Sequence, residues 1–131
     1  MACYLHPNVL DNGPAYLRAN CTRIVAVVAY AAGDSYATVT GAGNVVAAVD
    51  VSSADFSFTD GTSGARVLNN AATLTDASAD AAGNPTHFVF LDVANSAVLR
   101  ATEETSAGTI SAGGNVTFPN LPLVSQQPVA A

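Results

Sequence analysis

The chain changes its pattern after residue 22, where short apolar runs begin to alternate with clusters of Gly, Asn, Asp and Ser. Runs of β-branched and aromatic residues between turn-forming clusters are typical of β-strands. The strongest run, at residues 22–30, is apolar at nearly every position, as in a strand covered on both faces. A second run of this kind covers residues 87–93. The pattern predicts two central strands, with these residues in the core: Ile24, Val25, Val27, Phe88, Phe90 and Leu91.

Weaker runs predict the other strands. A tight turn at 94–96 should return residues 97–102 antiparallel to the second central strand. Strict alternation in the run 54–59 places Phe56 and Phe58 on one face. Further strands are expected at residues 35–40, 45–52, 65–74 and 115–124, whereas 75–85 is expected to be a loop.

Prolines mark both ends of the domain. Pro119 and Pro122 interrupt the last run, and a residue without an N–H lies at a sheet edge or where the chain crosses between sheets. Pro14 suits the first position of a short helix over residues 15–20, which Asp11 or Asn12 could cap.

About eight antiparallel strands in one domain are best buried as two packed sheets. The sequence therefore predicts an all-β fold, a β-sandwich of the jelly-roll or immunoglobulin-like kind with a short N-terminal helix. The expected domain spans residues 1–131, with an extended N-terminal arm at 1–10 and a C-terminal tail at 125–131.

The first ten residues and the stretch 119–128 carry apolar residues without a regular pattern. Such segments are too short to build a core, and proline keeps the second one extended. We expect both ends to lie outside the sandwich core and to contact other subunits through Tyr4, Leu5, Val9, Leu10, Leu121 and Leu123.

Composition narrows the choice of function. Charged residues make up 11% of the chain, against about 25% in a typical soluble domain. There is no Lys, and ten acidic residues against four Arg give a formal net charge of −6. A nucleic-acid binder would present a basic surface, so we expect no nucleic-acid partner. An acidic chain also disfavours electrostatic binding to a membrane surface.

No segment predicts insertion into a membrane or export. The longest apolar run has nine residues, about half of the roughly 18 that a membrane helix needs. The first seven residues lack the charged and apolar regions of a signal peptide, so we expect synthesis in a cytoplasm and no membrane partner. In a reducing compartment Cys3 and Cys21 are expected to be free thiols.

Candidate catalytic residues are sparse. His6 and His87 are the only imidazoles, and neither stands at metal-ligand spacing to a cysteine. Asp76, Asp80 and Asp92 would approach a cation only if the long loop folded back; otherwise they are solubilising carboxylates. Neighbouring acids such as Glu103 and Glu104 point to opposite faces of a strand. We therefore expect no enzyme activity and no catalytic, cofactor-binding or metal residues.

Four segments resemble small virion proteins encoded near the major capsid gene of tailed bacteriophages. They are residues 13–25 (GPAYLRANCTRIV), 54–66 (ADFSFTDGTSGAR), 76–89 (DASADAAGNPTHFV) and 111–119 (SAGGNVTFP). The resemblance covers most of residues 11–124, and it implies a structural role without catalytic residues.

Within that family, a head decoration or cement protein is the first expectation. The resemblance implies a place on the capsid surface of the virion after synthesis in the cytoplasm of a bacterial host. Its partners would be the major capsid protein and copies of this chain, with a trimer favoured by three-fold lattice positions. A tail-tube or minor tail protein is the first alternative, and an immunoglobulin-like adhesion module is the second.

Overall fold

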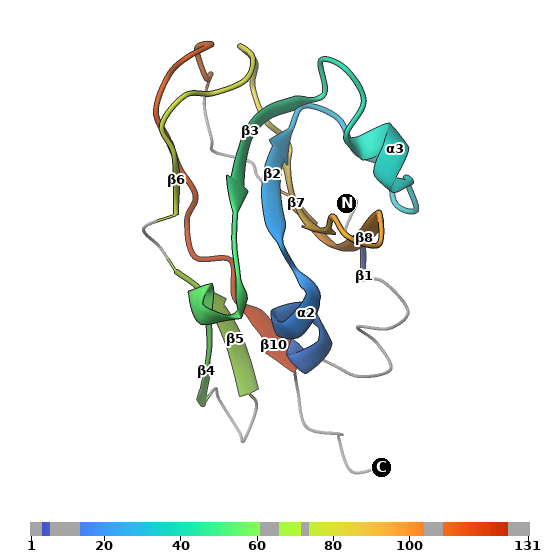
Figure 1. The fold of residues 1–131 in the computed structure, drawn as a ribbon, viewed down its shortest axis with the longest axis vertical. Helices are drawn as coiled ribbons and strands as arrows, with labels where there is room; N and C mark the ends of the chain where they lie inside the picture. Colours follow the sequence, from blue (N-terminus) through green and yellow to red (C-terminus); the bar gives the residue numbers. More distant parts are fainter. Residues whose placement is uncertain (1–3, 6–13, 61–65, 72–73, 104–108, 126–131) are drawn as a thin grey trace.

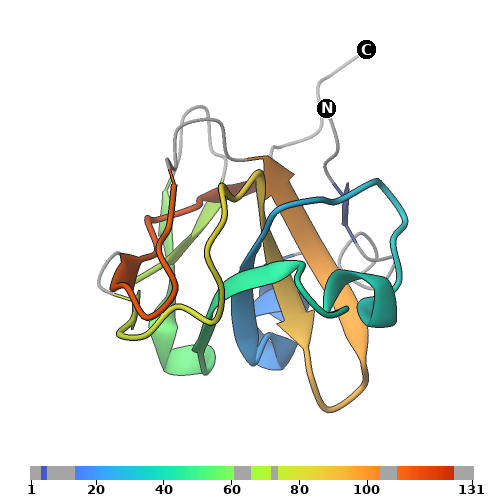
Figure 2. The same cartoon turned by 90° about the horizontal axis from the view of Figure 1, so that it is seen from above.

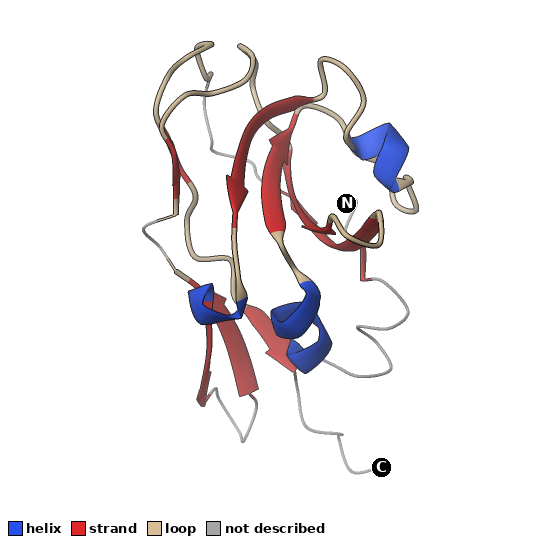
Figure 3. Ribbon diagram, in the orientation of Figure 1, coloured by secondary structure: helices blue, strands red, loops and turns tan. Residues whose placement is uncertain are grey.

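The structure is a computed structural model that describes residues 4–5, 14–60, 66–71, 74–103 and 109–125. Within these ranges the chain is mainly β-structure, with two short helices and one 3₁₀ turn (Figures 1 and 3). The elements in chain order are β1 (Tyr4–Leu5), α2 (Pro14–Asn20), β2 (Arg23–Val27), α3 (Tyr36–Val39), β3 (Val45–Asp50), η1 (Ser53–Asp55), β4 (Phe56–Asp60), β5 (Arg66–Asn70), β6 (Thr75–Asp76), β7 (His87–Asp92), β8 (Ala97–Glu103), β9 (Val116–Thr117) and β10 (Leu123–Ser125).

The strands form three antiparallel sheets. A five-stranded sheet has the order β1-β8-β7-β2-β3, a three-stranded sheet has the order β10-β5-β4, and β6 pairs with β9 in a two-stranded ribbon. The large sheet is the centre of the fold, and the two small sheets lie on one side of it (Figure 2). This arrangement confirms the expected all-β, sandwich-like fold.

The central strands β2 and β7 bury residues of both faces. Val25 pairs with Val89 on β7 and with Ala48 on β3. Because neighbouring residues of a strand point to opposite faces, Ile24 and Val25 enter two different clusters of apolar side chains. All six predicted core residues are buried, which confirms that prediction.

The larger cluster fills the space between the central sheet and the two small sheets. Phe90 of β7 lies 6.4 Å from Phe56 of β4, measured between ring centroids. Phe88 stands 5.5 Å from Phe118, which follows β9. Phe56 and Phe58 both belong to this cluster, so the alternation predicted for residues 54–59 is confirmed. These aromatic contacts join all three sheets into one core.

The smaller cluster lies on the opposite face, and α3 contributes to it (Figure 2). The predicted strand at residues 35–40 is wrong, because this segment forms α3. The Ser35 hydroxyl caps the helix by accepting the Thr38 N–H at 3.2 Å, and Val39 is fully buried in the cluster. The local cap and the burial of Val39 outweigh the β preference of an alternating, β-branched segment.

The short helix α2 lies where the sequence predicted a helix. Pro14 occupies the first position of α2, where its missing N–H would have no partner in any case, and Leu17 is buried. Its proposed caps, Asp11 and Asn12, lie outside the described residues. No helix in the described ranges is long and apolar enough to cross a membrane.

Candidate functional site

Two of the residues that were predicted to contact other subunits form part of a sheet in their own chain. Tyr4 and Leu5 form β1, which pairs with Ala101 and Arg100 of β8. This differs from the expected arm outside the sheets. The physical reason is that β8 would otherwise end the sheet with an open row of N–H and C=O groups.

The C-terminal contact residues also take part in their own domain. Leu123 lies in β10 and pairs with Leu68 of β5. Leu121 and Leu123 are half-buried against the larger apolar cluster, so the expectation that this segment lies outside the core is wrong here. Val9 and Leu10 fall outside the described residues, and contact of any of the six residues with another subunit remains a prediction.

Asn70 attaches the C-terminal crossing to β5. It is buried, its amide group donates to the Pro119 carbonyl at 2.9 Å, and its carbonyl oxygen accepts the Leu121 N–H at 2.7 Å. The Asn70 N–H donates to the side chain of Asn120 at 3.1 Å. In the sequence, the adjacent amides Asn69 and Asn70 interrupt a predicted strand. This irregularity was the available signal that one of them binds another segment.

Arg100 holds the next two residues of the same segment. Its guanidinium donates to the carbonyls of Leu121 and Pro122 at 2.7 and 3.0 Å and lies 5.0 Å above the Phe90 ring. These carbonyls have no strand partner in the described ladders, because β10 begins only at Leu123. Arg100 thus positions the C-terminal strand, and its guanidinium group is engaged in these contacts.

Of the three carboxylates considered for a cation, those of Asp76 and Asp92 accept hydrogen bonds from their own chain, and Asp80 is exposed. Asp76 accepts the Ala48 N–H and the Ser78 N–H, both at 3.0 Å. Asp92 accepts two bonds from Asn95 in the turn between β7 and β8. Across the described part of the chain, no three His, Cys, Asp or Glu side chains are grouped to hold a metal ion.

His87 and Cys21 are packed groups. The His87 ring is buried, its Nδ1 lies 2.9 Å from the Thr86 hydroxyl, and it contacts the Tyr30 ring at 5.5 Å between centroids. Cys21 is a free, buried thiol after α2, and burial raises its pKa to about 12. A thiol that stays protonated at neutral pH is a poor nucleophile.

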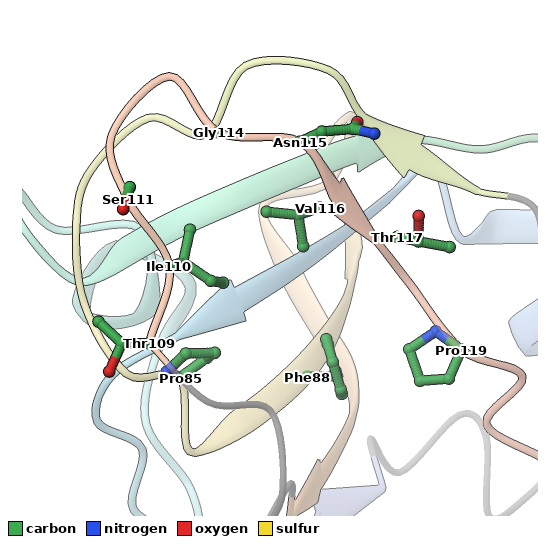
Figure 4. Close-up of a pocket in the computed structure, with 10 residues that line it drawn as sticks. All are labelled: Pro85, Phe88, Thr109, Ile110, Ser111, Gly114, Asn115, Val116, Thr117 and Pro119. Carbon is green, nitrogen blue, oxygen red and sulfur yellow. The ribbon is translucent and has the colours of Figure 1, made fainter.

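A groove of about 610 Å³ follows β9. Figure 4 shows the side chains of Ile110, Val116 and Phe88 directed into it, with Pro85 and Pro119 at its borders. The volume lies within the roughly 300–1,000 Å³ of ordinary binding pockets. None of the described lining residues is charged or carries an imidazole or a thiol. The groove therefore presents apolar side chains together with uncharged hydroxyl and amide groups.

A close backbone approach positions one wall of the groove. Ile110 forms two backbone hydrogen bonds with Gly83, at 2.9 and 2.7 Å. A Cβ at Gly83 would stand 2.9 Å from a Val46 methyl and 3.0 Å from a Val28 methyl, so only glycine brings this loop so close to the central sheet.

Comparisons of the chain with protein-family models, curated proteins and solved structures find no match.

Proposed function

We propose that this chain is a non-enzymatic structural protein of a tailed-bacteriophage virion, and specifically a decoration or cement protein on the capsid surface. The structural role is supported by the contacts that the polar side chains make within the chain. Asp76, Asn70 and Arg100 each bind backbone groups of loops or short strands. These contacts stabilise the fold, which supports a structural role.

The virion assignment rests on the four segments that resemble small phage structural proteins. Residues 54–66 and 76–89 of that resemblance include β4 and most of the loop that leads into β7. An acidic chain without Lys suits the outer face of a shell, because it is repelled by nucleic acid on either side. The partners that follow from the proposal are the major capsid protein and further copies of this chain.

The test compares particles that contain this protein with particles made without it. Low-resolution imaging should show density that disappears from regular positions on the head, and heads without the protein should break at a lower temperature. Adding the purified chain back should restore both properties. Density lost from the tail would instead support a tail-tube or minor tail protein, and particles of unchanged appearance would contradict the virion role.

A further inference from the structure

The groove along β9 is bordered by a strand edge that the ribbon leaves open. Phe118 donates its N–H to the Leu74 carbonyl at 2.7 Å, and Val116 pairs with Asp76. In an antiparallel ladder alternate residues face the partner strand. Val116 and Phe118 therefore direct their backbone groups to β6, whereas Asn115 and Thr117 direct theirs away from it.

The outward groups of Asn115 and Thr117 have no backbone partner within the described ranges. Both residues are exposed, and both line the groove. Figure 4 shows the Val116 side chain directed into the groove, on the side where Phe88 and Ile110 also point. An open strand edge beside a groove lined by apolar and uncharged polar residues is a geometry in which an extended peptide adds to a sheet, with backbone bonds to the edge and alternate side chains in the groove.

The chain itself contains a segment whose composition and length suit this groove. Residues 126–131 (QQPVAA) follow β10 and carry no charged side chain. The lining is also uncharged, so the side chains of this segment enter without burying an unpaired charge. Six extended residues span about 20 Å, and the groove follows β9 over a stretch of the same length, from Gly114 to Pro119. The side chains of Val129, Ala130 and Ala131 are small enough for a groove of this size.

We propose that residues 126–131 of a second copy of this chain add as a strand to the open edge of β9 and place Val129 in the groove. The inference rests on the proposed function in one respect, namely that copies of the chain assemble with each other. Repeated from copy to copy, this head-to-tail contact closes into a ring such as a trimer where the rotation allows.

The experiment measures self-association of the full chain by sedimentation velocity over a wide range of concentrations. Thr117→Pro removes the outward N–H but leaves the ladder with β6 intact, because that N–H faces away from β6. Thr117→Val is its matched control, since it keeps the N–H. Val129→Glu introduces a charge into the added segment, and Ser57→Glu introduces the same charge on the exposed side of β4.

We expect the full chain to associate and both Thr117→Pro and Val129→Glu to raise the dissociation constant about tenfold or more. Both controls should associate like the unaltered chain. As a measurement that does not depend on a variant, hydrogen exchange of the Thr117 amide should slow as the protein concentration rises.

Three results would overturn the inference. They are a full chain that is monomeric at every concentration, association that Thr117→Pro leaves unchanged, and a loss with Thr117→Pro that Val129→Glu does not reproduce. The last result would assign the edge to a different segment. A monomer that still binds particles would refute this inference alone, whereas a self-associating chain absent from particles would refute the proposed function alone.

Discussion

The central sheet and the C-terminal segment at residues 109–125 are stabilised by different means. Strands β2, β7 and β8 have five to seven residues each, and β7 is buried at all six of its positions. Strands β9 and β10 have only two and three residues. The first region is held by continuous ladders and apolar burial, and the second by side chains such as Asn70 and Arg100 that bind its backbone.

This difference predicts which kind of substitution destabilises each region. Apolar burial scales with the area removed from water, so the central sheet tolerates the loss of any one hydrogen bond better than the loss of a large side chain. In the C-terminal segment a few polar groups also hold backbone atoms that have no ladder, so the loss of one hydrogen-bonding side chain is costly there as well. The first three predictions below test this contrast, from the largest expected effect to the smallest.

The largest effect is expected from Phe90→Ala. Phe90 is fully buried between Phe56 and Arg100, so truncation should leave a cavity and lower the free energy of unfolding by about 3–5 kcal/mol. Urea denaturation monitored by circular dichroism measures the change. Phe58→Ala, at a half-buried position, should cost clearly less. Equal losses at the two sites would show that Phe90 is not at the centre of the core.

Asn70→Ala should have the next largest effect. The change leaves the Leu121 N–H and the Pro119 carbonyl without their partner in a partly buried crossing, which should cost about 2–3 kcal/mol. Asn69→Ala is the matched control, since Asn69 makes exposed bonds to Asn120 and Thr59 and should cost under about 1 kcal/mol. If the two amides prove equivalent, the C-terminal crossing is not held in the way described here.

Asp76→Ala should destabilise by about 1–2 kcal/mol, because it removes the acceptor for the Ala48 N–H at the edge of β3. The protection of that amide in hydrogen exchange should fall more than the global stability does. Asp80→Ala removes the same charge from an exposed side chain nearby and should stay within about 0.5 kcal/mol. A matching loss with Asp80→Ala would point to net charge as the cause.

Cys21 should make stability fall at high pH. Burial raises the pKa of its thiol from 9.0 to about 12, so above pH 9 the unfolded chain loses this proton while the folded chain keeps it. The unfolded state is then favoured by about 1.4 kcal/mol for each pH unit between 9 and 12, and nothing is lost below pH 9.

Subtracting the pH profile of Cys21→Ala from that of the unaltered chain isolates the thiol from the tyrosines that ionise in the same range. Profiles that run parallel from pH 8 to pH 11 would contradict the buried, protonated thiol. Thiol counting after denaturation without reductant should also find two free thiols, one for Cys21 and one for Cys3.

The segment at residues 35–40 shows where a local pattern misleads. Its alternation of Tyr36, Thr38 and Thr40 with apolar residues favours a strand, but it forms α3. The helix depends on Asn44, which donates to the Val39 carbonyl at 2.8 Å and accepts the Ala29 N–H at 3.0 Å. Asn44 comes close to both groups only after β2 and β3 have paired, so the local Ser35 cap was the one helix signal within the segment, and the alternation alone favoured a strand.

The groove along β9 was beyond sequence reasoning for a similar reason. Phe88 was expected as a core residue and Val116 as a strand residue, but Ile110 comes from the stretch between the strands expected at 97–102 and 115–124. The bond of Ile110 to Gly83 joins two loops that are 27 positions apart in the chain. The chain has ten glycines, and the sequence does not show that Gly83 is the one at which a Cβ would collide with the central sheet.

The sequence by itself determined the all-β class, the short helix α2, the central strands and the residues that they bury. These features follow from side-chain periodicity and turn chemistry, which act between residues close in the chain. Only the tertiary structure decided that Tyr4 and Leu5 close the edge of β8, that Asn70 and Arg100 hold the C-terminal crossing, and that β9 keeps an open edge beside a groove. Each of these depends on which backbone groups remain without a partner after the sheets have packed, and that is a property of the whole fold.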